Sequence, residues 1–317
     1  MVKTRIYLLI SCAKVVFWGV VLTGKVGAMG LTLSAAPVAC NTPPAASPSP
    51  PAAAKNRLPD SQVVRGQHDI QWAWLGSPTL RYPHGALGSP THAGSLHVLA
   101  VGANGKVQEV VLHLPLRKVF EDRIPRLVDL DDDGRDEIIV VESDALQGSA
   151  LVVLGLRPVA KDKTAPLELI ELARSPSTGS TFRWLNPVGV ADFDGDGRLD
   201  VASVTTPHIG GVLTLHHYRP PLLVPYAKAM DTSNHRMGAL EQSLAVIVSP
   251  AGQRPTILVP DMTQRALHAL RWAAPGQWEE MQALTPLPDR VERMTPIPGG
   301  ACLHLTNGSW WRATLMN

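Results

Sequence analysis

The stretch ADFDGDGRLDV, residues 191–201, places acidic side chains at alternate positions of a glycine-containing turn. Counted from Asp192, acids stand at positions 1, 3, 5 and 9, a glycine that permits a sharp bend stands at position 6, and position 7 offers a backbone carbonyl. Calcium takes 6–8 hard oxygen ligands, and this spacing turns several of them toward one centre. We therefore predict a calcium loop whose ligands are Asp192, Asp194, Asp196, the Arg198 carbonyl and Asp200.

A second acidic stretch, VDLDDDGRDEI at residues 128–138, repeats the pattern 63 residues earlier (192 − 129). Asp132 stands where the other stretch has Gly195, and the last acid is a glutamate with a longer arm, so the two sites are expected to differ in affinity. The predicted ligands are Asp129, Asp131, Asp133, the Arg135 carbonyl and Glu137. A solvated acidic turn without an ion is the alternative for both stretches.

The residues that follow the acidic stretches exclude an EF-hand. That loop needs a glutamate at position 12 and a helix after it. Position 12 is Val140 in one stretch and Ser203 in the other, and both stretches continue into β-branched runs. Each acidic loop is therefore expected to join two strands.

Short runs rich in Val, Ile, Leu and Thr alternate with Gly, Pro, Asn and Asp from about residue 60 onward. Such runs have the length of strands and are bounded by turn residues, which predicts an all-β domain. Asn104-Gly105 and Asn307-Gly308 are typical of two-residue hairpin turns. Residues 226–243 are the exception, and we expect a short helix or a long loop there.

A repeated strand–loop–strand layout indicates the architecture. Residues 246–259 show the same layout without acids, and degenerate copies are predicted around residues 102–105 and 306–308. Repeats of this size in an all-β chain favour a β-propeller. The 257 residues after position 60 (317 − 60) would hold about five blades at roughly 40–50 residues each. We predict about five to seven four-stranded antiparallel blades, with a strand near residues 62–75 closing the ring against the last blade.

The two acidic stretches resemble the aspartate-rich loops of the FG-GAP/VCBS repeat family, the integrin α-type of β-propeller. The resemblance implies a propeller whose loops bind Ca²⁺ between two strands of a blade. It covers the two acidic repeats firmly and the rest of residues 61–317 loosely. The chain departs from the family in carrying two complete loops, and the resemblance does not imply a particular ligand.

The first 60 residues are predicted to be targeting and spacer sequence. Basic residues flank short apolar runs in residues 1–39, which is typical of a secretory signal, with an uncleaved membrane anchor as the alternative. Cys40 follows small residues as in a bacterial lipobox, although Pro37 replaces the usual Leu. Residues 40–60 are rich in Pro, Ala and Ser, which predicts a disordered linker. We expect an exported protein, in the periplasm or at the cell surface, either free or lipid-anchored through Cys40.

Charge and cysteine content exclude several functions. The net charge of +2 is scattered, so nucleic-acid binding has no electrostatic basis. The three cysteines, Cys12, Cys40 and Cys302, show no zinc-ligand spacing, and they suggest no disulfide framework. His216 and His217 are adjacent in a predicted strand, so they face opposite sides and do not share an ion. Glu279-Glu280 is interpreted as polar surface.

The sequence thus predicts a monomeric calcium-binding propeller that serves as a scaffold or binds a protein or a glycan, and it predicts no catalytic residue. Most of the seven tryptophans beyond the targeting segment are expected to pack between blades, with one or two available as ligand platforms. The alternative is an enzyme that uses the central funnel, such as a polysaccharide lyase or a quinone-dependent dehydrogenase. It would need Arg, His, Lys or Tyr side chains to converge, with Tyr82, Tyr218 and Tyr226 as the available tyrosines.

Overall fold

The computed structural model describes residues 30–36, 40, 51–102, 105–160, 165–274, 277–280 and 284–316. Strands account for 53% of the chain and helices for 2%, which confirms the predicted all-β class. A short 3₁₀ helix, η2 (Ala52–Asn56), precedes the first long strand. In the described part of the chain, no helix has the length and apolar character required to cross a bilayer.

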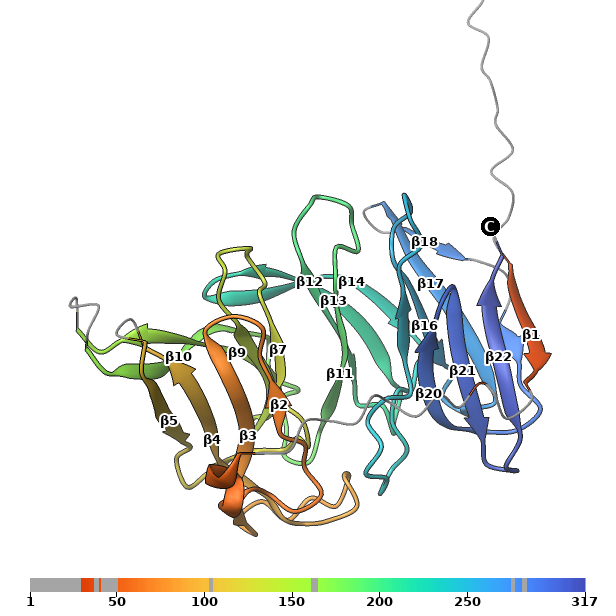
Figure 1. The fold of residues 1–317 in the computed structure, drawn as a ribbon. Coiled ribbons are helices and arrows are strands. Elements are labelled where there is room, and N and C mark those ends of the chain that lie inside the picture. Colours follow the sequence, from red (N-terminus) through yellow and green to blue (C-terminus); the bar gives the residue numbers. More distant parts are fainter. Residues whose placement is uncertain are drawn as a thin grey trace, which may run out of the picture.

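Twenty strands of the described part form five antiparallel meanders of four strands each (Figure 1). The first contains β2 (Val64–Arg65), β3 (Ile70–Thr79), β4 (His92–Val101) and β5 (Val107–His113). The second contains β7 (Arg126–Val128), β8 (Glu137–Asp144), β9 (Gly148–Pro158) and β10 (Leu167–Arg174). The third contains β11 (Leu185–Ala191), β12 (Asp200–Thr205), β13 (Val212–Arg219) and β14 (Leu222–Met230).

The fourth meander contains β15 (Val246–Val248), β16 (Thr256–Pro260), β17 (Ala266–Ala274) and β18 (Gln277–Glu280). The fifth contains β20 (Val291–Ile297), β21 (Gly300–Leu305), β22 (Trp310–Leu315) and β1 (Leu31–Ala35). Two short strands lie outside the meanders. β6 (Lys118–Phe120) pairs with β4 and β8, and β19 (Thr285–Pro286) pairs with β17. Residues 231–245 form a loop rather than a helix.

Successive meanders pack face to face through separate hydrophobic clusters. Alternate residues of β8 point to opposite sides of the sheet. Ile138 and Val140 therefore pack with Leu96 of the first meander, whereas Ile139 and Val141 pack against the third. Two further clusters join the third meander to the fourth and the fourth to the fifth. Within the described residues, no hydrophobic cluster joins the fifth meander to the first.

Strand β1 completes the fifth meander, although it lies at the other end of the chain. It pairs with β22 over five residue pairs, from Leu31 opposite Leu315 to Ala35 opposite Trp311. The predicted closing strand near residues 62–75 is wrong, because β2 and β3 pair with each other and β3 continues to β4. The folded part also begins upstream of the predicted boundary at residue 61, and residues 1–29 lie outside the described residues.

Cys40 and Cys302 form a disulfide, with their Cα atoms 5.8 Å apart. Both side chains are buried. The expectation that the chain has no disulfide is therefore wrong, because strand β1 carries Cys40 back to β21 across 262 residues of sequence. A lipid thioether needs the same sulfur atom, so lipidation of Cys40 and this disulfide exclude one another. The predicted linker is also partly ordered, since Leu58 within it is fully buried.

The degenerate copies predicted from asparagine–glycine turns are misplaced. The acid-free layout at residues 246–259 does form β15, a loop and β16, the first two strands of the fourth meander. The turn at Asn307-Gly308 instead joins β21 to β22, the second and third strands of the fifth meander. Residues 103 and 104 lie outside the described residues, and the flanking strands are the third and fourth of the first meander. A hairpin turn recurs wherever antiparallel neighbours meet, so it does not mark one position in a meander.

A buried polar network fixes the connections that lead into the second, third and fourth meanders. The Gln242 amide donates to Asp122 Oδ1 (3.2 Å) and Asn186 Oδ1 (3.3 Å), and its oxygen accepts the backbone N–H of Arg123 (3.1 Å). Asn186 in turn donates to the Asn234 carbonyl (3.1 Å). Buried polar groups require such partners, so the network specifies how these connections meet.

Candidate metal loops and the adjoining cleft

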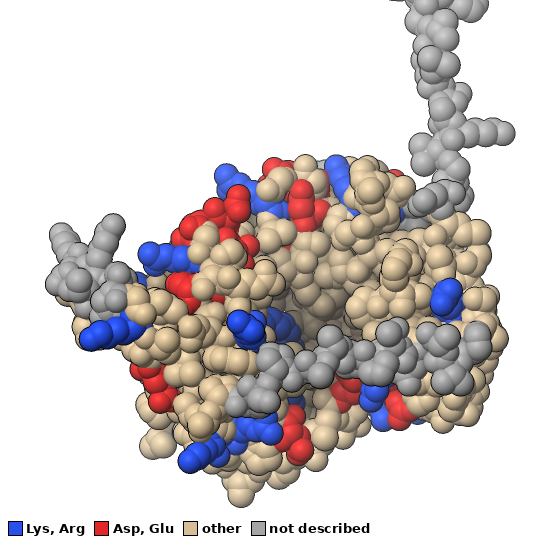
Figure 2. Space-filling view, in the orientation of Figure 1, with Lys and Arg blue, Asp and Glu red and all other residues tan. Residues whose placement is uncertain are grey.

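The two acidic stretches join the first strand to the second in neighbouring meanders. The first loop connects β7 to β8, and the second loop connects β11 to β12. A shallow cavity of about 280 Å³ is lined by both, with Asp131 from the first and Arg198 from the second. Acidic side chains gather over this edge of the molecule in Figure 2. The strand–loop–strand context predicted from the sequence is confirmed.

The first carboxylate of each loop folds the loop around itself. Asp129 accepts hydrogen bonds from the backbone N–H groups of Asp133 (3.1 Å) and Gly134 (2.8 Å). Asp192 accepts from those of Gly195 (2.7 Å) and Gly197 (3.0 Å). The glycine at position 6 has a φ of +81° in the first loop and +86° in the second, a conformation that costs other residues energy. Local chemistry thus produces the same turn twice.

In the first loop, Asp129, Asp131 and Glu137 offer ligand atoms within 4.8 Å of one another. Glu137 is buried, and its Oε2 accepts the backbone N–H of Leu130 (2.8 Å). Asp133 stands outside this group and accepts the N–H of Arg135 (2.9 Å). Positions 1, 3 and 9 of the predicted ligand set therefore converge, and position 5 faces the turn.

The pKa values in the first loop reflect crowded negative charge. Burial, followed by repulsion from Asp131, Asp133 and Asp129, raises the pKa of Glu137 to about 7. Burial and the same neighbouring carboxylates raise the pKa of Asp131. Loss of solvation raises the pKa of Asp129, but hydrogen bonds from the N–H groups of Gly134 and Asp133 lower it, and the net pKa is below its usual value. A bound cation would relieve this repulsion.

The second loop divides its carboxylates into two overlapping groups. Asp192, Asp194 and Asp196 lie within 4.8 Å of one another, and Asp194 also belongs to a group with Asp200 and His217. Asp194 and Asp196 each accept the N–H two residues ahead, at 3.0 and 2.9 Å. Arg198 provides one of these donors, as Arg135 does in the first loop. Within the described residues, the backbone carbonyls of Arg135 and Arg198 accept no hydrogen bond.

Asp200 is held by partners that the sequence did not indicate. Its Oδ1 lies 3.0 Å from Nδ1 of His217, and its Oδ2 accepts the Tyr226 hydroxyl (2.8 Å) and the Phe193 N–H (3.3 Å). Burial raises the pKa of Asp200, and the hydrogen bonds from Tyr226 and His217 oppose that rise. His217 lies opposite Asp200 in the β12–β13 register, which local sequence does not reveal. His216 contacts the Val201 carbonyl instead, so the two histidines have separate partners, as predicted.

The converging carboxylates fit a hard cation. Oxygens bound to one calcium at about 2.3–2.6 Å lie at most about 5 Å apart. The ligand atoms of both loops meet this condition, since each group spans no more than 4.8 Å. The donors are mainly carboxylate oxygens, which calcium prefers over the nitrogen and sulfur ligands of zinc.

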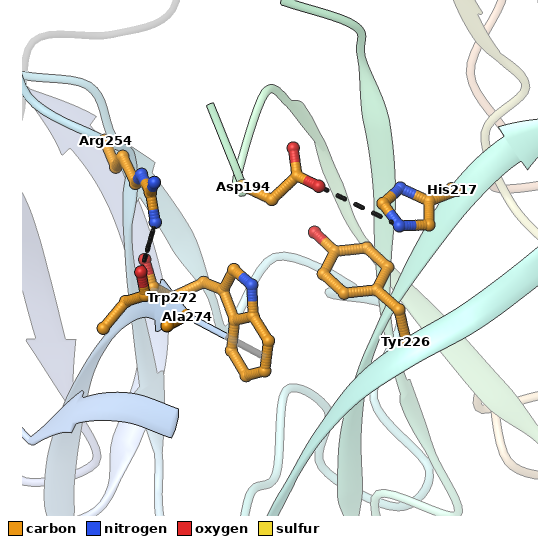
Figure 3. A pocket seen from close by; sticks show the side chains of 7 residues that line it. Asp194, His217, Tyr226, Arg254, Trp272 and Ala274 are labelled. Atoms are coloured by element: carbon orange, nitrogen blue, oxygen red, sulfur yellow. Dashed lines mark hydrogen bonds and ion pairs between the residues drawn. The ribbon is translucent and has the colours of Figure 1, made fainter. Parts of the chain in front are cut away.

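A cleft of about 380 Å³ lies beside the second loop, lined by the third and fourth meanders (Figure 3). Its polar and aromatic lining comprises Asp194 from the loop, His217 from β13, Tyr226 from β14, Arg254 from the β15–β16 connection and Trp272 from β17. Ala273 and Ala274 complete the lining. We refer to this cavity as the aromatic cleft.

Ring stacking gives the aromatic cleft a firm wall. Tyr226 stacks on His217 with ring centroids 4.0 Å apart, and it meets Trp272 edge to face at 5.8 Å. Trp272 is 4% exposed and packs in the cluster between the third and fourth meanders, while part of its ring lines the cleft. Nη1 of Arg254 donates to the carbonyls of Trp272 (3.1 Å) and Ala273 (2.6 Å).

The tyrosines proposed for an enzyme do not converge. Tyr82 is buried, and its hydroxyl accepts the Phe182 N–H (2.8 Å), far along the sequence from the cleft residues. Tyr218 packs in the cluster between the second and third meanders. Tyr226 alone of the three lines the aromatic cleft, where His217 and Arg254 join it. Glu279 is exposed and lies 3.6 Å from Arg271, in agreement with its interpretation as surface.

The chain was also compared with known proteins. No protein family matches it, and no curated protein shows significant similarity to it.

Proposed function

We propose that the protein is a calcium-stabilised β-propeller with five blades, formed by the five meanders. Each blade would be one four-stranded meander, and hydrophobic clusters between successive meanders support this stacking. Pairing of the N-terminal β1 with the C-terminal β22 supports a ring in which both ends of the chain share the last blade. This architecture agrees with the resemblance to FG-GAP/VCBS propellers.

Calcium would bind the two acidic loops and stiffen one edge of the second and third blades. The observation that carries the proposal is the convergence of three carboxylates within 4.8 Å in each loop, at the same strand junction of neighbouring meanders. Ions held there would be structural, because the loops join strands and the carboxylates also bind the loop's own N–H groups. Such a rigid scaffold suits a module that binds a protein or a glycan.

The N-terminal sequence and the disulfide support an exported module, which we propose to act as a monomer. Disulfides persist in oxidising compartments such as the bacterial periplasm. The Cys40–Cys302 bond is buried within the fifth meander and depends on export to such a compartment. Contact with a membrane would come through the N-terminal segment alone.

Thermal denaturation in calcium and in chelator tests the calcium proposal. Preferential binding to the folded state adds about 2.7 kcal/mol per site when calcium is at roughly 100 times its Kd. We expect millimolar calcium to raise the melting temperature, and Asp194→Ala to remove most of the gain from the second loop. Glu168→Gln, which removes an exposed carboxylate from β10, serves as the control and should keep the full gain. An unchanged wild-type melting temperature in calcium would refute the proposal.

Calcium affinity of the first loop should fall below neutral pH. The pKa of Glu137 is about 7 without an ion, so a proton must leave as calcium binds. Below pH 7 the affinity should weaken by up to about tenfold per pH unit, since one proton is exchanged. Calorimetric titrations between pH 5.5 and pH 8, chosen as roughly one unit or more either side of that pKa, measure this effect. Glu137→Gln should bind calcium weakly and without this pH dependence.

The enzyme alternative gains support from one observation. His217, Tyr226 and Arg254 converge on the aromatic cleft, a constellation that an acid–base enzyme acting on an anionic polysaccharide would need. Its location differs from the predicted central funnel, because it lies between two neighbouring meanders. Incubation with polygalacturonate, followed by measurement of newly formed chain ends, distinguishes turnover from binding alone.

A further inference from the structure

We propose that the aromatic cleft binds an acidic sugar, with the carboxylate of a hexuronic acid on Arg254 and its hydroxyls on Asp194, His217 and Trp272. The inference extends the glycan-binding part of the proposed function by naming a ligand class and a site. It does not require calcium in the second loop.

Arg254 presents the edge that recognises a carboxylate. Its Nη1 is tied to the carbonyls of Trp272 and Ala273, which fixes the plane of the guanidinium. No carboxylate among the described residues lies within ion-pair distance of it, and Nε and Nη2 have no protein acceptor there. That edge offers two parallel N–H donors, the geometry that binds a carboxylate through both oxygens.

A glycine keeps this edge accessible. A Cβ placed on Gly195 would lie 3.1 Å from Nε of Arg254 and 3.7 Å from its Nη2. Any side chain at this position would therefore crowd the donors. The first loop has Asp132 at the equivalent position, with a φ of +59°, so an L-residue can adopt this turn. Gly195 in the second loop therefore shapes the turn and also keeps side-chain atoms away from the Arg254 donors.

Two further side chains present polar nitrogen atoms to the cleft. Trp272 is 4% exposed, and in Figure 3 its indole nitrogen faces the space between Arg254 and Tyr226. This N–H has no acceptor among the described residues. Nδ1 of His217 lies 3.0 Å from Asp200 Oδ1, and its Nε2 lies 3.9 Å from Asp194 Oδ2, within ion-pair distance and facing the cleft. Both residues line the cleft, so these nitrogens are accessible to a polar ligand.

The arrangement of charge orients the ligand. Figure 3 shows Asp194 beside His217 and Arg254 on the fourth meander, so a carboxylate would lie on the arginine and hydroxyl donors would face Asp194 and His217. Tyr226 and Trp272 supply flat apolar surface between them. A pyranose ring combines hydroxyls with an apolar face, and one ring fits a cleft of about 380 Å³.

Binding of D-galacturonate to the full-length protein tests the proposal, with D-galactose as a matched ligand that lacks the carboxylate. Saturation-transfer NMR and intrinsic tryptophan fluorescence report binding in calcium and in chelator. We expect galacturonate to bind and galactose to bind at least about tenfold more weakly, since hydrogen bonds to charged groups contribute about 1.5–3 kcal/mol. Arg254→Gln should lose galacturonate binding by a similar factor, and Arg254→Lys should recover only part of it.

Arg293→Gln is the matched control, because it removes an equal charge from an exposed site on β20 and should leave binding unchanged. Equal binding by wild type and Arg254→Gln would overturn the proposal, as would absence of galacturonate binding. Equally strong competition by acetate would overturn the sugar assignment, because it would show a simple anion site. If calcium stabilises the protein but galacturonate does not bind, the sugar inference fails and the calcium proposal stands. If galacturonate binds in chelator but calcium does not raise the melting temperature, the calcium proposal fails and the sugar inference stands.

Discussion

Replacing Cys40 and Cys302 together with alanine is expected to lower the free energy of unfolding by roughly 3–5 kcal/mol. The bond spans 262 residues, so it restricts the unfolded chain strongly, and a long closed loop gives the largest entropic effect. It also retains β1, which pairs with β22 at the edge of the fifth meander. Urea denaturation of the oxidised wild type and the double variant measures the difference.

Hydrogen exchange locates the effect of the disulfide. Amides of Leu31–Ala35 should lose protection in the double variant, whereas those of β8 in the second meander should change only through the global stability. Reduced wild type should behave like the variant. Intact-mass measurement with and without reductant on the full-length protein shows whether the two sulfurs are bonded or Cys40 carries a lipid. Equal stability of oxidised wild type and variant would contradict the predicted role.

The second large effect is a loss of stability in acid, caused by buried histidines. His235 donates from Nε2 to the Ala239 carbonyl (3.0 Å), so its Nδ1 accepts from Nε2 of His208 (2.8 Å). Trp184 packs against both rings. Burial lowers the pKa of His208 to about 4, and burial together with His208 lowers the pKa of His235 to about 3. Both rings are neutral in the folded protein at pH 5.

The sign of the pH dependence follows from these pKa values. The unfolded chain takes up protons below its histidine pKa of about 6.5, while the folded protein does not until about pH 4. Each histidine therefore costs about 1.4 kcal/mol of stability per pH unit below 6.5, which gives up to about 5 kcal/mol for the pair at pH 4.5. Stability is fully present above pH 6.5 and falls as the pH decreases.

Urea denaturation at pH 7.5 and pH 5.0, in chelator, checks this prediction. The difference in the free energy of unfolding between the two pH values should be roughly 2 kcal/mol smaller in His208→Gln. This variant keeps a donor for His235 but cannot take up a proton. His113→Gln, at an exposed position of β5, is the control and should behave like wild type. An identical pH dependence in His208→Gln and wild type would show that another group controls acid unfolding.

Local sequence was sufficient to predict the acidic loops. Asp129 and Asp192 fold their loops with N–H groups no more than five residues away, so the turn depends on residues that the motif itself contains. The all-β class was equally accessible, because alternating apolar runs and turn residues have a short period. Calcium binding and the propeller ring stay predictions, since carboxylate spacing indicates an ion without demonstrating one.

Features that depend on pairing between distant segments could not be predicted from the sequence. The segment around β1 has the composition of a signal region, and its pairing with the edge of β22 cannot be read from its own residues. His217 reaches Asp200 because β12 and β13 adopt one register, and a shift of one residue would turn His217 to the other face.

The strand-rich class and the two acidic turns therefore follow from local sequence, because neighbouring residues produce both. The pairing of β1 with β22, the Cys40–Cys302 bond and the aromatic cleft arise only in the folded chain. The physical reason is that Arg254 and Trp272 come from the fourth meander and His217 from the third, so their proximity arises when apolar faces pack together and has no counterpart in local sequence.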